Sequence, residues 1–166
     1  MDSAFDNYFA LSDVLLEDLA ALLDSESNSQ HWRRNYIRVS ASLIEGYAHC
    51  LREMCKVSLE CVAPAIGQKE AEVLGSERNF YANERIKLTL RVAYKLFELQ
   101  PAPNFGGPEW RRAQRVLEKR NLLMHPKCTG DLEIPDDLWT ELYDDVAWLL
   151  EQLFNFIAAL QKKHNA

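Results

Sequence analysis

Residues 30–61 read QHWRRNYIRVSASLIEGYAHCLREMCKVSLEC, and this stretch decides the fold class. Apolar side chains recur in it at steps of three and four residues, namely Tyr36, Val39, Leu43, Tyr47, Cys50, Met54, Val57 and Cys61. Such spacing places the apolar side chains on one face of an α-helix. We therefore predict a single helix over 30–61, about 48 Å long at 1.5 Å per residue. Pro64 and Gly67 are expected to end it.

The same spacing predicts helices in most of the remaining chain, and no convincing strand pattern appears. We expect long helices over residues 3–24, 83–99, 108–124 and 135–163, with a short helix around 70–74. Pro108 suits the first turn of a helix, and Pro126 disfavours helical geometry at the residue before it. The expected fold is an all-α, up-and-down bundle of four to five long helices, in a single domain spanning residues 1–166.

A second line of residues runs along a different face of the helix predicted over 30–61. It consists of Arg34, Arg38, Glu45, His49 and Arg52. Charged side chains on a long helix are usually solvated. We therefore expect this face to be exposed to solvent, and a functional role for it is the less favoured alternative.

Composition excludes several protein classes. No run of about 18 apolar residues exists to span a membrane, and the N-terminus lacks the basic start and apolar core of a signal peptide. We expect a cytoplasmic protein. The four cysteines form no Cys-x-x-Cys pair, so reduced, buried thiols are favoured over a zinc site. No metal and no cofactor are predicted.

Charge is unevenly distributed along the chain, whose net charge is −6. Residues 1–30 carry −7, residues 31–77 are neutral, residues 78–127 carry +7 and residues 128–166 carry −6. Segregated positive charge of this kind is typical of an acidic protein with one local anion site. Simple packing of acidic helices beside a basic one explains it equally well.

The basic segment ends in Arg120-Asn121-Leu122-Leu123-Met124-His125-Pro126. Arginine is always charged and its planar fork matches phosphate oxygens, while histidine exchanges protons near neutral pH. Together they can cleave RNA without a metal, through attack of a ribose 2′-hydroxyl on its own phosphodiester. Residues five apart are separated by about 140° around a straight helix. Arg120 and His125 therefore converge only if the helix loosens, the arginine reaches round, or two copies meet. A surface salt bridge and a helix cap are the structural alternative.

The run Glu118 to Pro126 resembles the Arg-Asn-x-x-x-His motif of the HEPN superfamily, the higher eukaryotes and prokaryotes nucleotide-binding domains. The architecture of residues 30–160 is similar too. The resemblance implies a helical bundle that dimerises, with two Arg-His pairs facing each other across a cleft. Many members are metal-independent endoribonucleases of toxin–antitoxin or phage-defence systems, while others have lost the activity.

On this resemblance Arg120 and His125 match the catalytic pair, and Asn121 matches the polar residue beside the arginine. Glu45 is a looser match to an acidic residue near the site, and Lys119 is a further candidate for substrate binding or support. Lys127 stands where one subgroup has a tyrosine that a partner nucleotidyltransferase modifies.

Three functions follow as hypotheses. The first is an endoribonuclease that acts on RNA as a homodimer, with an antitoxin or a nucleotidyltransferase as a possible partner protein. The second is a non-catalytic helical module of the same kind that binds a nucleotide or a protein. The third is an adaptor or immunity protein whose acidic ends cover a basic partner.

Overall fold

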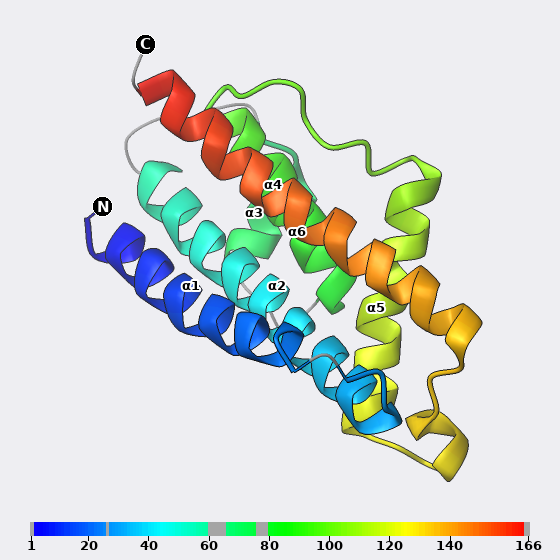
Figure 1. Cartoon of the computed structure of the whole chain (residues 1–166). Coiled ribbons are helices and arrows are strands. Elements are labelled where there is room, and N and C mark those ends of the chain that lie inside the picture. The colour runs from blue at the N-terminus through cyan, green and yellow to red at the C-terminus, as the bar shows by residue number, and fades with distance from the viewer. Residues whose placement is uncertain (1, 26, 60–65, 76–79, 165–166) are drawn as a thin grey trace.

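The described part of the chain, residues 2–25, 27–59, 66–75 and 80–164 of a computed structural model, is helical and contains no strand. Its α-helices are α1 (Asp2–Leu23), α2 (Gln30–Leu59), α3 (Gln68–Gly75), α4 (Ala82–Leu96), α5 (Pro108–Met124) and α6 (Asp136–His164), with a short 3-10 helix, η2 (Thr129–Leu132), between the last two. The predicted all-α bundle is therefore confirmed, and α2 and α6 are its longest helices, as expected (Figure 1).

Helix α2 forms the centre of the bundle. It packs against α1, α4, α5 and α6, and Figure 1 shows α1 and α6 running beside it along much of its length. Its apolar face is buried completely at Ile37, Leu43 and Met54. Because neighbours surround the helix on several sides, the buried stripe is wider than the spacing predicted and also includes Ala41 and Ile44.

Helix α1 approaches α2 closely at Gly46. A Cβ atom at this position would lie 3.0 Å from Leu11 Cδ2 and 3.3 Å from Leu15 Cδ1. The absence of a side chain at Gly46 thus lets the two helices approach closely, and a larger residue there would require the side chains of Leu11 and Leu15 to move.

Helix α5 begins and ends where its prolines predict. Gly107 is the N-cap and Pro108 occupies the first turn, where its missing N–H costs no hydrogen bond. The helix continues to Met124, and His125 follows as the C-cap with φ −132° and ψ 58°. In Figure 1, α5 lies across the bundle, with its C-terminal end near the start of α2.

Helix boundaries differ from the predictions by a few residues. The helix predicted over 83–99 runs from Ala82 to Leu96, because Phe97 caps it and Glu98 adopts a positive φ of 50°. The helix predicted over 30–61 is described to Leu59, and Cys61 lies outside the described residues. Within the described ranges, no helix combines the length and apolar character needed to cross a membrane.

Candidate active site

Arg120 of α5 forms an ion pair with Glu45 of α2. Its Nη2 donates to Glu45 Oε2 at 2.8 Å, and its Nη1 donates to the side-chain oxygen of Asn121 at 3.1 Å. The structure thus brings together three of the five predicted site residues. The side chains of Arg120 and Glu45 remain 27% and 23% exposed, so the arginine side chain is held in place and is still partly open to solvent.

His125 lies five residues after Arg120 and is exposed. Its backbone N–H donates to Asn121 O at 3.0 Å, which continues the helical pattern to the last residue. The helix therefore does not loosen before Pro126. The side chains of Arg120 and His125 point in directions about 140° apart around its axis. A helix cap is present, but the backbone of His125 makes it. In the described part of the chain the imidazole has no hydrogen-bond partner.

Lys119 is buried and supports the segment that follows His125. Its Nζ donates to the carbonyl oxygens of Asp131 at 2.8 Å and Glu133 at 2.7 Å. Burial lowers the pKa of this lysine, and the nearby carboxylates of Asp131 and Glu133 oppose that shift. Of the two roles predicted for Lys119, the geometry favours support over contact with a substrate.

Two arginines of α2 fix the same segment from the other side. Arg38 Nη2 donates to Leu123 O at 2.9 Å, which satisfies one of the carbonyls left open at the end of α5. Arg34 Nη1 donates to Leu132 O in η2 at 3.2 Å. The chain on both sides of His125 is therefore braced by cationic side chains.

The polar face of α2 is therefore not solvated as expected. Arg52 is buried, Arg34, Arg38 and Glu45 are partly buried, and only His49 is exposed. The expectation was wrong because it considered the helix alone, whereas α4, α5 and η2 cover this face in the fold. The charged side chains of α2 therefore line the candidate site and do not form an independent charged surface.

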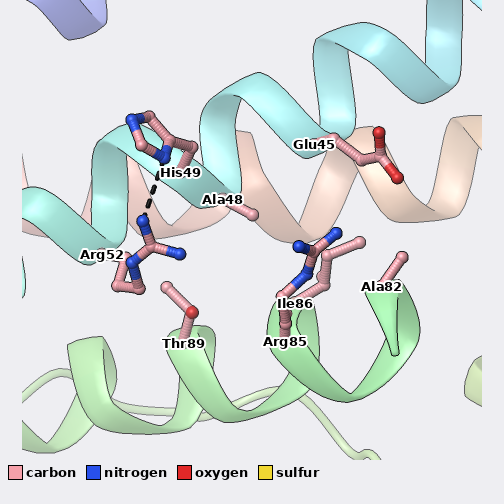
Figure 2. Close-up of a pocket in the computed structure, with 8 residues that line it drawn as sticks. All are labelled: Glu45, Ala48, His49, Arg52, Ala82, Arg85, Ile86 and Thr89. Carbon is pink, nitrogen blue, oxygen red and sulfur yellow. Dashed lines mark hydrogen bonds between the residues drawn. The ribbon is translucent and has the colours of Figure 1, made fainter. Parts of the chain in front are cut away.

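Two cavities of about 190 Å³ each lie beside the ion pair. One is a groove between α2 and α4 that includes Glu45 at one end, and the other lies between α4 and α5 and includes Asn121. Figure 2 shows Arg52 extending from α2, and Arg85 and Thr89 from α4, into the first groove. Neither Arg85 nor Thr89 was predicted from the sequence as a site residue. The net positive charge of residues 78–127 was the available signal, but it gives no position.

Metal ligands are not grouped in the residues described. They contain no set of three or more histidine, cysteine or acidic side chains that could hold a metal ion. Cys50 and Cys55 are buried free thiols, and burial raises the pKa of Cys55 to about 12. Both therefore behave as small apolar side chains in the core, whereas Cys128 is exposed.

Comparison with protein-family models, with curated proteins and with solved structures finds no match to this chain.

We expect Lys119→Met to destabilise the fold by about 1–3 kcal/mol, because the carbonyls of Asp131 and Glu133 would lose their shared buried donor. Urea unfolding followed by circular dichroism measures this. Lys127→Met is the matched control, since Lys127 is exposed and its loss should change stability by about 0.5 kcal/mol at most. Equal stability of the two variants would contradict a bracing role for Lys119.

Proposed function

We propose that the protein is a metal-independent endoribonuclease whose catalytic groups are Arg120 and His125. The proposal rests on the environment of the Arg120 side chain. Glu45 and Asn121 hold its guanidinium, yet more than a quarter of the side chain is open to solvent. Donors fixed in advance are the most effective way to stabilise charge that develops in a transition state.

The proposed reaction needs one base, one acid and one cationic clamp. A neutral His125 imidazole takes the proton of the ribose 2′-hydroxyl, and the 2′-oxygen attacks the adjacent phosphorus. Arg120 stabilises the charge on the phosphate oxygens. The bond from phosphorus to the 5′-oxygen breaks, and a protonated histidine supplies a proton to that oxygen. The products are a 2′,3′-cyclic phosphate and a 5′-hydroxyl end.

A dimer would supply both histidines. It would also bring an arginine and a histidine together, which a single α5 helix does not do because its Arg120 and His125 point in different directions. Arg120 is directed toward α2, while His125 leaves the end of α5 on another side. Two copies related by a two-fold axis could place the arginine of one beside the histidine of the other, because such an interface presents the same patch from both partners. Leu122 and Met124, which are 41% and 50% exposed, would provide apolar contact there.

We expect light scattering to give the mass of a dimer at tens of micromolar protein. Met124→Glu should shift the mass toward the monomer and reduce RNA cleavage together with it. Val14→Glu on α1 is the matched control, since Val14 is also an exposed apolar residue, at 58%, but on a helix that packs mainly against α2. A wild-type monomer that cleaves RNA would contradict the dimer.

The activity itself is tested by incubating the protein with single-stranded RNA in excess EDTA. The proposal requires cleavage under these conditions. RNA that is bound but stays intact, with or without added divalent cations, would favour the non-catalytic module instead.

A defence or toxin–antitoxin setting is part of the same proposal. Cleavage of cellular RNA would make the free protein toxic, so a partner acting as antitoxin would have to block the site or modify it. Expression of the wild type should then slow bacterial growth, while expression of His125→Ala should not.

A further inference from the structure

The groove between α2 and α4 is lined by residues that the proposed cleavage reaction does not use. They are Ala48, His49 and Arg52 from α2, and Ala82, Arg85, Ile86 and Thr89 from α4, with Glu45 at one end. Two guanidiniums on opposite walls, an imidazole and a hydroxyl thus border one cavity (Figure 2). This combination of donors is suited to an anion rich in oxygen atoms.

Hydrogen bonds fix the α2 wall of this groove. Arg52 is 4% exposed, and its Nη2 donates to His49 Nδ1 at 3.0 Å and to Glu53 Oε1 at 3.0 Å. A guanidinium can only donate, so Nδ1 of His49 accepts, which places the proton of the neutral imidazole on Nε2. The position of Arg52 and the tautomer of His49 are therefore set before any ligand arrives.

Two carboxylates lie near this wall, and each of them is bonded to a cation. Glu45, at one end of the groove, accepts a hydrogen bond from Arg120. Glu53 accepts hydrogen bonds from both Arg52 and Lys56, and the bond from Lys56 is 2.7 Å long. One negative charge is therefore shared by two cations. These two ion pairs also hold down the pKa of Glu53, against the effect of its partial burial.

The size of the groove limits the ligand. A volume of about 190 Å³ exceeds the roughly 30 Å³ of one water molecule several times, but it is below the roughly 300 Å³ at which drug-sized ligand sites begin. It suits a phosphate or a diphosphate with part of a sugar, and the base of a nucleotide would extend into solvent.

We propose that this groove is a phosphate-binding site formed by Arg52, Arg85, His49 and Thr89. It goes beyond the proposed ribonuclease activity, because phosphate binding requires neither His125 nor cleavage. The phosphate belongs either to a free nucleotide or to the RNA strand that leads to Arg120, which the ion pair with Glu45 places next to the groove.

Calorimetric titration of the full chain with sodium pyrophosphate and with 5′-AMP tests the site. Arg85→Gln should raise the Kd of pyrophosphate at least tenfold. Lys87→Gln is the matched control, since it removes the same charge from the same helix outside the groove, and it should change the Kd less than twofold. Thr89→Val, which keeps the shape of the side chain, provides a second variant if Arg85→Gln does not fold.

Three results would overturn the proposal. They are no binding of pyrophosphate to the wild type, equal weakening by Arg85→Gln and Lys87→Gln, or binding of acetate as tight as that of pyrophosphate. The source of the phosphate is identified in the His125→Ala background, where RNA should stay intact. Weaker binding of RNA after Arg85→Gln assigns the site to the strand, whereas unchanged RNA binding with weaker binding of 5′-AMP assigns it to a free nucleotide.

Discussion

His125→Ala should reduce RNA cleavage by a factor of about 10²–10⁴, which is the usual contribution of a general acid–base group. Its melting temperature should stay close to that of the wild type. The imidazole is exposed, and the hydrogen bond that caps α5 comes from the backbone N–H, which alanine retains. Initial rates on a labelled RNA, measured in EDTA beside a thermal melt, provide both numbers.

The control for this variant is His31→Ala. His31 is also an exposed histidine near a helix end, but it lies at the start of α2, where its ring contacts the side chain of Asn35. It should cleave RNA at the wild-type rate. Full activity of His125→Ala would remove this residue from the mechanism, and a large loss of stability would mean that the side chain caps the helix after all.

Arg120→Lys should reduce cleavage by a factor of about 10²–10³, comparable to the loss of one donor to a developing oxyanion. Lysine keeps the positive charge, but it cannot bond Glu45 and present a planar fork to a phosphate at the same time. The ion pair is partly exposed, so its loss should cost the fold at most about 1 kcal/mol. The readout is the ratio of kcat to KM for the same RNA.

Arg111→Lys is the matched control for this substitution, because Arg111 is an exposed arginine on the same helix. Glu45→Gln separates clamping from charge, since glutamine can still accept a hydrogen bond from Arg120. Glu45→Gln should lower the ratio of kcat to KM by a smaller factor than Arg120→Lys does. A variant Arg120→Lys with normal kinetics would show that the ion pair is only structural.

Helical periodicity carried most of the fold prediction. The spacing of apolar residues in 30–61 and 135–163 is regular, and the two long helices appear where this spacing places them. Helix α5 was bounded correctly because Pro108 and Pro126 constrain the backbone directly. The end of α4 was misplaced because its apolar pattern continues through Leu99, which is buried although the helix has already ended.

The site was only partly predictable. The sequence pointed to Arg120, Asn121 and Glu45, which the structure brings together, but not to the roles of Arg34 and Arg38 as braces of the segment around His125. Partners of these arginines are backbone carbonyls about 85–98 residues away, and every residue type offers such an acceptor. Only tertiary contacts reveal them.

The groove between α2 and α4 could not be predicted from the sequence either, because it also depends on tertiary contacts. Arg52 and Arg85 are separated by a segment that contains α3, and nothing in their local sequence pairs them. Helix packing brings the two arginines to one cavity. Charge counts can indicate that an anion site exists in such a chain, but they cannot give its location.

The most direct test of the central claim uses two RNA substrates that differ by one oxygen atom. One is a short RNA with a defined cleavage position, and the other carries a 2′-deoxy nucleotide on the 5′ side of that position. Mass spectrometry of the products in EDTA should show 2′,3′-cyclic phosphate and 5′-hydroxyl ends from the first substrate and no cleavage at the deoxy position of the second. Cleavage of both substrates, or products ending in a 5′-phosphate, would contradict 2′-hydroxyl attack at an arginine–histidine site.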